Sequence, residues 1–248
     1  MKSVEELDVT SSLLSDDIIL LISRIKGLRK LRMHRCSLSR VNLWSLSDLE
    51  ELNVISSLLS SDDILSISRI KGLKRLRIRH CRVSRVSLWP LSDLEELDLS
   101  SNPLSDDDIL SISGVKGLER LRMDDCELSQ VNIGPLSNLK NLEHVSELDV
   151  SSSPLSNNAI LAISKAGGLK RLWMRWCRLN RADLAPLRGL DNLESLDISG
   201  SYINDGAISV LVSLRDKALR KLRVSACNMS GEDKELLEGL DGLEIIWH

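Results

Sequence analysis

An internal repeat organises the whole sequence. Segments related to LEELDLS place a leucine at Leu7, Leu52, Leu97, Leu148 and Leu196, and segments related to LKRLRIRHC place one at Leu31, Leu76, Leu121, Leu172 and Leu222. The two series alternate, about 24 residues and then about 21, and an eleventh copy begins at Leu243. Such periods are typical of solenoids, in which each unit buries its apolar side only against its neighbours. We therefore expect a stacked array.

Each unit has the pattern LxxLxLxx(S/N/C)xL, as in LEELDLSSNPL at residues 94–104. The pattern resembles that of the leucine-rich-repeat family, and the resemblance covers essentially the whole chain, residues 1–248, which we expect to form a single solenoid domain. The resemblance implies an α/β horseshoe, in which one curved parallel sheet of about 11 short strands lines the concave face and helices and turns form the convex face. It also implies a helical, ribonuclease-inhibitor-like back for the longer repeat.

The residues themselves support these elements. In Leu97-Asp98-Leu99 the side chains alternate faces, so we expect the leucines in the core and Glu96, Asp98 and Ser100 facing outward. In LSDDDILSISGVKGL, Ser105 can cap a helix, three aspartates favour its N-terminal end, and Ile109, Ile112 and Val115 recur at helical spacing. The shorter repeat carries RVSLWPLSDL, where Pro90 and the limited length predict a turn. Helical and turn-like backs should therefore alternate.

All five cysteines occupy one position of the shorter repeat: Cys36, Cys81, Cys126, Cys177 and Cys227. The longer repeat has Ser12, Ser57, Asn102, Ser153 and Ser201 there. Successive cysteines would lie two strands apart, about 9.6 Å, which is too far for a disulfide. We expect buried thiols in a reducing compartment and no metal site, because the sequence contains no CxxC and its His-Cys pairs lie on separate layers.

The outward residues of the strands alternate in charge. The longer repeats offer Glu6 and Asp8, Glu51 and Asn53, Glu96 and Asp98, Glu147 and Asp149, Ser195 and Asp197. The shorter repeats offer Lys30 and Arg32, Arg75 and Arg77, Arg120 and Arg122, Arg171 and Trp173, Lys221 and Arg223. Adjacent rows can neutralise each other across a strand spacing of about 4.8 Å, or they can recognise a partner with the complementary pattern.

The next outward position breaks this alternation and includes Arg79 and Arg175. Aromatic residues are rare, at 2% of the sequence, so Trp173, Trp176 and Trp247 stand out where we expect them on or beside the concave face. Trp beside Arg is typical of binding hot spots. We expect Trp44 and Trp89, in equivalent convex segments, to be packed. The predicted partner-binding residues are Arg171, Trp173, Arg175, Trp176, Arg79, Arg122, Asp149 and Asp197.

Composition disfavours several classes of function. The formal net charge is −3, so sequence-independent attraction to phosphate is absent and nucleic acid is an unlikely partner. There is no apolar run long enough for a membrane span, and the first residues lack the apolar stretch of a signal peptide. No GxSxG, GxGxxG, GxxxxGK(S/T) or HExxH motif occurs, so we expect no enzyme and no cofactor. We expect a soluble intracellular protein, cytoplasmic or nuclear.

Three functions fit these residues. The first is a non-catalytic module that binds another protein through the concave face. The second is a structural or designed consensus repeat scaffold without a natural ligand. The third is binding of an acidic ligand or RNA through Arg75, Arg77, Arg79, Arg120 and Arg122, which the neighbouring carboxylates oppose. Because neither end carries a polar cap, we also expect a fragment or an uncapped array, with end-to-end self-association through the termini.

Overall fold

The computed structural model describes residues 4–38, 41–83, 85–138, 145–204 and 206–247. The chain divides into two compact units, Met1–Glu119 and Arg120–His248. The expectation of one solenoid domain over residues 1–248 stays a prediction, and each unit is described by itself.

The first unit has five strands in its main sheet, two very short strands and three α-helices. The main strands are β1 (Glu6–Thr10), β3 (Lys30–His34), β5 (Glu51–Ile55), β6 (Arg75–Arg79) and β7 (Glu96–Asp98). The short pair is β2 (Leu13–Leu14) and β4 (Ser37–Leu38). The helices are α1 (Asp16–Ser23), α2 (Ser61–Ile67) and α3 (Asp106–Ser113), with a 3-10 turn η1 (Leu43–Ser45).

The second unit has six strands, three α-helices and four 3-10 turns. The strands are β8 (Arg120–Arg122), β9 (Glu147–Asp149), β10 (Arg171–Trp173), β11 (Ser195–Asp197), β12 (Lys221–Arg223) and β13 (Glu244–Ile246). The α-helices are α4 (Asn157–Ile163), α5 (Gly206–Arg215) and α6 (Gly231–Glu238). The 3-10 turns are η2 (Leu128–Gln130), η3 (Gly134–Asn138), η4 (Leu179–Arg181) and η5 (Ala185–Gly189).

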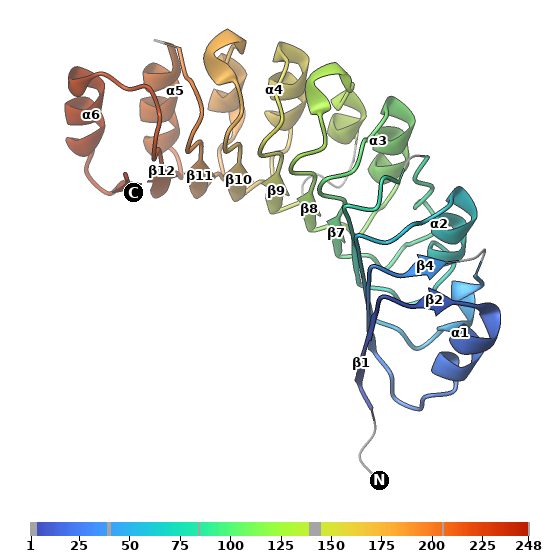
Figure 1. The fold of residues 1–248 in the computed structure, drawn as a ribbon. Coiled ribbons are helices and arrows are strands. Elements are labelled where there is room, and N and C mark those ends of the chain that lie inside the picture. The colour runs from blue at the N-terminus through green and yellow to red at the C-terminus, as the bar shows by residue number, and fades with distance from the viewer. Residues whose placement is uncertain (1–3, 39–40, 84, 139–144, 205, 248) are drawn as a thin grey trace. The chain divides into compact units, whose positions relative to one another are not determined.

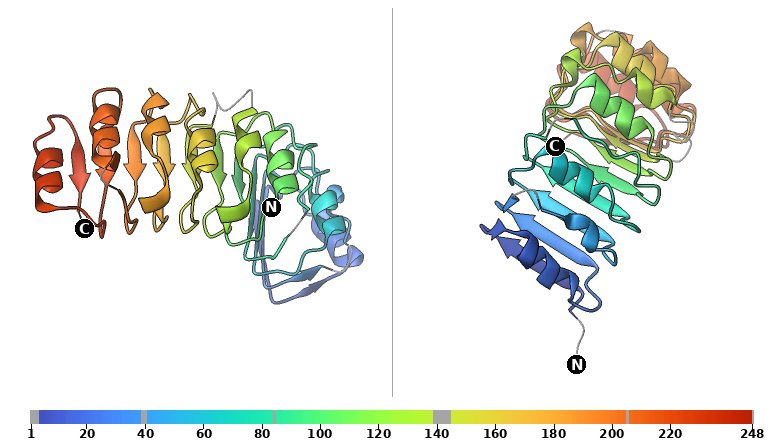
Figure 2. Two further views of the ribbon diagram at one scale, coloured as in Figure 1. Left: turned by 90° about the horizontal axis from the view of Figure 1, so that it is seen from above. Right: turned by 90° about the vertical axis from the view of Figure 1, so that its right-hand side faces the viewer.

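The order of the strands follows the chain. It is β1-β3-β5-β6-β7 in the first unit and β8-β9-β10-β11-β12-β13 in the second, and the predicted parallel sheet of about 11 strands is confirmed. Equivalent leucines lie side by side, as Leu52 beside Leu76 and Leu172 beside Leu196. In each unit the helices lie on one side of the sheet (Figure 1, Figure 2). We call that side the back and the other side the open face.

The helices of the longer repeats begin as the sequence predicts. Ser105 Oγ accepts a hydrogen bond from the N–H of Asp108 (3.4 Å), and Asp108 Oδ2 accepts one from the N–H of Ser105 (2.8 Å). This reciprocal pair is a capping box, which satisfies donors that the first helical turn leaves unpaired. Ile109, Ile112 and Val115 are buried, so the helical spacing identified the side that packs on the sheet.

The predicted alternation of backs holds until the last cysteine-containing repeat. The return from β3 forms a 3-10 turn, and so do those from β8 and β10, but the return from β12 forms the helix α6. Ser230 and Asp233 make a capping box there, with Asp233 Oδ2 accepting from the N–H of Ser230 (3.1 Å). The expectation of a turn is wrong at this point because the repeat carries the Ser-x-x-Asp signal of a helix start.

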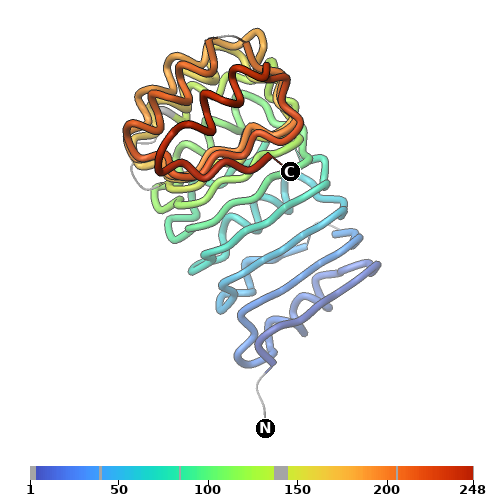
Figure 3. The backbone as a smooth tube through the Cα atoms, turned by 90° about the vertical axis from the view of Figure 1, so that its left-hand side faces the viewer, coloured from blue at the N-terminus to red at the C-terminus, as the bar shows by residue number. Residues whose placement is uncertain are grey.

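In ten repeats, a residue at or shortly after the end of the strand adopts the left-handed backbone conformation. These residues are Ser11, Arg35, Ser56, His80, Ser101, Asp125, Ser152, Trp176, Gly200 and Ala226, with φ from 50° to 69°. For most of these residues the N–H donates to a carbonyl at or just after the next strand, as Ser56 does to Arg79 (2.9 Å) and Trp176 to Ser199 (2.8 Å). Left-handed backbone is uncommon outside glycine. The hydrogen bond to the next repeat offsets the cost of this left-handed backbone. The chain turns from the strands toward the back in a similar way from repeat to repeat (Figure 3).

Candidate functional site

The charge rows of the open face occur as predicted. The register places Glu51 beside Arg75 and Arg75 beside Glu96 in the first unit. In the second unit it places Glu147 beside Arg171 and Lys221 beside Glu244. Side chains of opposite charge on adjacent strands are close enough to pair.

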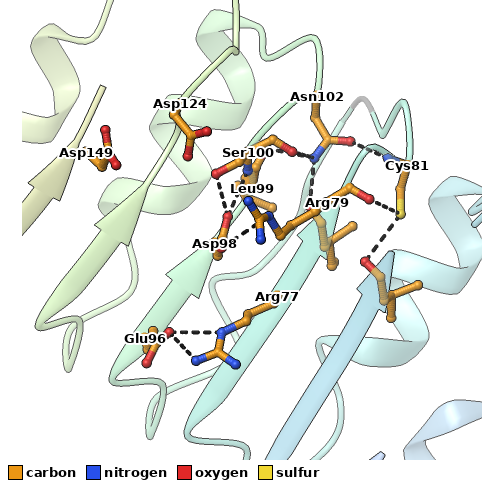
Figure 4. A network of polar contacts seen from close by, with 12 residues as sticks. Arg77, Arg79, Cys81, Glu96, Asp98, Leu99, Ser100, Asn102, Asp124 and Asp149 are labelled. Carbon is orange, nitrogen blue, oxygen red and sulfur yellow. Dashed lines mark hydrogen bonds and ion pairs between the residues drawn. The ribbon is translucent and has the colours of Figure 1, made fainter. Parts of the chain in front are cut away.

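In the first unit the arginines bridge neighbouring strands. Arg77 contacts Glu51 at 3.2 Å on one side and Glu96 at 2.8 Å on the other, and Arg75 contacts Glu51 at 3.1 Å. Arg79 lies beside Asp98 at 3.6 Å (Figure 4). Burial lowers the pKa of Arg77, but the hydrogen bond to Glu96 and the charges of Glu96, Glu51 and Asp98 outweigh it, and the pKa is raised. These arginines are therefore held in place.

The carboxylates on β5 and β7 are buried, contrary to expectation. Glu96 is 8% exposed, Asp98 2% and Ser100 0%, although the sequence alternation places them on the open face. The guanidinium side chains stay more open, at 31% for Arg77 and 41% for Arg79. A long arginine side chain can extend over a shorter carboxylate on the next strand. A partner approaching these strands would meet N–H donors before carboxylates.

The aspartates also hold the backbone at the end of the strand. Asp98 Oδ1 accepts from the N–H and the hydroxyl of Ser100 at 3.1 and 2.6 Å. Asp149 Oδ1 accepts from the N–H of Ser151, and Asp197 Oδ1 from the N–H of Ser199, both at 3.0 Å. Asp149 and Asp197 are only 6% and 3% exposed. These two predicted binding residues are thus positioned to hold their neighbours, with little surface of their own.

Strand β10 and the three residues after it carry four of the predicted binding residues, Arg171, Trp173, Arg175 and Trp176. Arg171 pairs with Glu147, and Arg175 pairs with Asp149 (3.2 Å) and bonds to Ser151 Oγ (3.3 Å). The side chains of Arg171 and Arg175 remain 53% and 43% exposed above these partners. Because each guanidinium group is held by an acceptor of the preceding repeat, it needs less ordering when it binds a second acceptor.

Trp176 follows Arg175 in the chain, and its indole lies on the next repeat. A Cβ atom built on Gly200 would lie 2.4–2.7 Å from atoms of the Trp176 ring, so the indole lies directly against the Gly200 backbone. The residue is nevertheless 64% exposed. Gly200 is the one glycine in the column of left-handed residues, and the missing side chain makes room for the indole.

The remaining predicted residues divide between the units. Arg122 pairs in register with Asp149, Asp149 with Trp173, and Trp173 with Asp197, so these four form one row across β8 to β11. Trp173 is half-buried and Arg122 is exposed. Arg79 lies in the first unit and is not part of this group. Arg75 and Arg77, which would contribute to binding of an acidic ligand or RNA, are engaged with Glu51 and Glu96.

The cysteine position links consecutive repeats. The N–H of Cys36 donates to Ser57 Oγ (2.9 Å), that of Cys81 to Asn102 Oδ1 (3.0 Å) and that of Cys177 to Ser201 Oγ (3.0 Å). The thiols of Cys36, Cys81, Cys177 and Cys227 are placed to donate to a carbonyl of the preceding longer repeat, as Cys177 Sγ to Val150 O (3.4 Å). All five cysteines are free thiols; Cys227 is half-buried and the others are buried.

The thiols have a structural environment. Burial raises the pKa of Cys177 to about 12, with a further increase from the charge of Asp149, and burial also raises the pKa of Cys81 and Cys227. Nucleophilic and metal-binding cysteines need the thiolate form, which these surroundings disfavour. The residues that the structure describes contain no group of three or more metal-ligating side chains.

Trp44 and Trp89 are more exposed than the sequence interpretation predicts, and Trp247 points toward helix α6 instead of outward. Trp44 and Trp89 were expected to be packed on the back but are 51% and 69% exposed. Trp247 was expected to face outward, but it is half-buried, with its ring centroid 6.0 Å from Lys234 Nζ of α6. Tyr202 is 66% exposed and was not singled out. Sequence periodicity assigns a face, but not whether the next repeat covers the side chain.

The chain was compared with known proteins. A model of the family described as Leucine Rich Repeat matches residues 93–115. Among solved structures, an internalin (inlF) from Listeria monocytogenes is similar, with a TM-score of 0.58 and 19% sequence identity over 98% of this chain and 80% of that one. Internalin C2 from the same species has a TM-score of 0.52 and 19% identity, over 75% of this chain and 72% of that one. No curated protein sequence matches.

At this level of identity the structural likeness concerns the fold. Folds of this kind are typical of protein-interaction modules, since a row of strands offers an extended binding surface. Within the described part of the chain, no helix has the length and apolar character needed to cross a bilayer. The recurring LxxLxL unit, the family match over residues 93–115 and the parallel sheet in chain order agree, and the chain has the leucine-rich-repeat fold.

Proposed function

We infer that this protein is a non-catalytic interaction module that binds another protein through the open face of the second unit. The observation that carries this function is the group on β10 and the residues just after it: Arg171 and Arg175 are held by carboxylates yet exposed, and Trp176, next to Arg175 in the chain, is also exposed. Arginine and tryptophan are the residues that most often dominate binding energy at interfaces.

The chemistry of the partner follows from what is exposed. Glu147 and Asp149 lie beneath the arginines, with side chains 17% and 8% exposed, so a partner would meet guanidinium donors and an indole. The complementary surface offers carboxylates or backbone carbonyls and one apolar side chain to lie on Trp176. Five unpaired cysteines suit a reducing, intracellular compartment.

A peptide library displayed on phage and selected against the full chain tests this function. We expect enrichment of acidic peptides that carry an apolar side chain. Arg171→Ala, Trp173→Ala and Arg175→Ala combined should then weaken binding of the selected peptide at least tenfold in a calorimetric titration.

Two matched variants make the result specific. Lys165→Ala, at an exposed position just beyond α4, removes a charge from the back of the same unit and should leave the affinity unchanged. Gly200→Ala removes no contact group but displaces the indole, and should weaken binding if Trp176 contacts the partner. Equal affinity for the triple variant and the wild type, with circular dichroism showing both folded, would refute the site.

A further inference from the structure

A row of exposed apolar side chains runs along the back of the first unit. It alternates between helix and return segment and consists of Leu20, Trp44, Leu65, Trp89 and Leu110, which are 47%, 51%, 39%, 69% and 61% exposed. We call these five residues the back row. Trp44 and Leu65 line one groove, and Trp89 and Leu110 line the next. Contiguous apolar surface of this kind marks an interaction site more often than a free surface.

The fold does not require the back row. Gly134 and Ala185 of the second unit occupy the position of Trp44 and Trp89, and Ser209 of α5 follows the leucine series of the earlier helices. The second unit forms the same strands and helices without exposed tryptophan on its back. The tryptophans of the first unit therefore need a reason other than folding.

Charges of opposite sign flank the back row. Asp17 and Leu20 lie on α1, and Arg24 follows its last residue; Asp62 and Leu65 lie on α2, and Arg69 comes two residues after its end. Residues at i and i+3 share one side of a helix, Asp62, Leu65 and Arg69 line the same groove, and all of these charged residues are exposed. Because the helices run in the same direction from repeat to repeat (Figure 2), the aspartates lie along one edge of the row and the arginines that follow the helices along the other, except that Arg85 lines the groove of Trp89 together with Asp107. In α3, Asp107 continues the acidic edge and Gly114 takes the place of Arg69.

This banded surface is complementary to itself. A two-fold axis parallel to the back row turns a second copy so that its basic edge faces the acidic edge of the first, and its acidic edge faces the basic one. The same rotation brings each tryptophan beside its own counterpart, where indoles can stack. A partner of one charge sign would instead meet like charge along one edge.

We propose that the back row of the first unit is the contact between two copies of this chain in a closed, parallel homodimer. The open face is not part of this contact. Dimerisation thus stands independently of the function proposed for β10, and the combined Arg171, Trp173 and Arg175 variant dimerises like the wild type.

Sedimentation velocity of the full chain over a concentration series tests the dimer. We expect a monomer–dimer equilibrium in the micromolar range that weakens as salt is added. Trp44→Ala combined with Trp89→Ala should raise the dissociation constant at least tenfold. Leu161→Ala, which removes an equally exposed leucine of α4 in the second unit, is the matched control and should change nothing. A chain that stays monomeric throughout, or open-ended assemblies such as end-to-end contacts would give, overturns the proposal.

An exchange of charges tests the geometry. One variant carries Asp17→Lys and Asp62→Lys, and the other carries Arg24→Glu and Arg69→Glu. Each alone presents like charges to its own copy and should be monomeric, whereas an equimolar mixture should form a heterodimer. A mixture that stays monomeric, while each variant keeps its circular dichroism spectrum, contradicts the parallel two-fold arrangement even if the wild type dimerises.

Discussion

The backs of the two units satisfy equivalent backbone groups in different ways. In the first unit the N–H of Val41 donates to Asp63 (3.2 Å) and that of Val86 to Asp108, so the turn of one repeat is bonded to the helix of the next. In the second unit the positions of these aspartates hold Ala159 and Ala207. There the N–H of Val131 donates to Leu128 O (3.2 Å) and that of Ala182 to Leu179 O (3.1 Å), within 3-10 turns.

A second position shows the same difference. Val83 donates its N–H to Asn102 Oδ1 of the next repeat at 3.2 Å, while the equivalent Leu179 donates to Cys177 O of its own turn at 2.9 Å. A buried N–H must find an acceptor, but the acceptor need not come from the same place. Where a side chain of the next repeat supplies it, the turn stays extended; where none does, the backbone winds into a 3-10 turn. The repeat template therefore tolerates loss of the aspartate if the turn changes with it.

The largest loss of stability is expected when Asp108 is replaced. Asp108→Ala should lower the free energy of unfolding by about 3 kcal/mol, because it removes half of a capping box and leaves the buried N–H of Val86 without its acceptor. Urea denaturation measures the loss. Asp107→Ala, an exposed neighbour in the same turn, is the control and should cost well under about 1 kcal/mol. Similar losses of stability for Asp108→Ala and Asp107→Ala would show that the bond to the N–H of Val86 does not stabilise the first unit, and the difference between the two backs would lose its meaning.

A smaller loss is expected at the turn position. Asn102 Nδ2 donates to Ile78 O and Leu99 O, both at 2.7 Å, besides accepting from Cys81 and Val83. Asn102→Ser should cost about 1–2 kcal/mol, since serine cannot make all four bonds. Ser201→Asn in the second unit should change stability by less than about 0.5 kcal/mol because Leu179 already has an acceptor. A clear gain from Ser201→Asn would contradict this account.

The thiols provide a pH test. The native state holds the proton of Cys177 more tightly than the unfolded chain, whose thiol has an ordinary pKa near 9.0, because burial raises the native pKa to about 12. The free energy of unfolding should therefore fall as pH rises from about 9 toward 12. Cys177→Ser should remove about 1 kcal/mol of that fall at pH 10.

Cys81→Ser in the first unit serves as the comparison for Cys177. Burial also raises the pKa of Cys81, but without the added charge of an aspartate, so its contribution to the slope should be smaller. Serine already occupies the equivalent position of longer repeats, so both variants should fold. Identical pH slopes for the wild type and Cys177→Ser, measured by urea denaturation at several pH values, would show that this thiol is not the titrating group.

The smallest effect concerns Trp89. Its side chain is largely exposed, so Trp89→Ala should change the stability of the dilute monomer by less than about 1 kcal/mol. Thermal unfolding at sub-micromolar concentration measures it, because association would add concentration-dependent stability. A loss of several kcal/mol would mean that the tryptophan supports the first unit itself, and that the contrast between the two backs is a matter of folding.

The sequence was sufficient for the features that depend on local pattern. The LxL alternation predicted the strands and their order, Ser105 and the aspartates predicted the start of α3, and the spacing of the cysteines excluded disulfides. The group on β10 could also be assembled from register alone, because parallel strands in chain order bring Arg171, Trp173 and their neighbours together.

Features that depend on how far one side chain reaches over another were not predictable in this way. Burial of Asp98 and Asp149 results from arginines on adjacent strands and from serine hydroxyl or N–H groups two residues on, and alternation of faces does not contain that information. The exposure of Trp89 depends on the small residue at Gly114 of α3, 3.6 Å from the tryptophan Cβ if it bore a side chain. The helix α6 was missed because the expected turn was carried over from an earlier repeat, despite its own capping signal.

The bond from the N–H of Cys36, Cys81 and Cys177 to the serine or asparagine of the next repeat has a consequence for how such a chain can change its length. If one of the longer repeats were deleted, two cysteine layers would become neighbours, and a backbone donor would face sulfur, a poor acceptor. If two consecutive repeats were deleted or duplicated together, each of these N–H groups would still face a serine or asparagine oxygen. The heritable unit of this array is thus the pair, and the equal 45-residue intervals that separate Cys36, Cys81 and Cys126 are the steps in which it can grow.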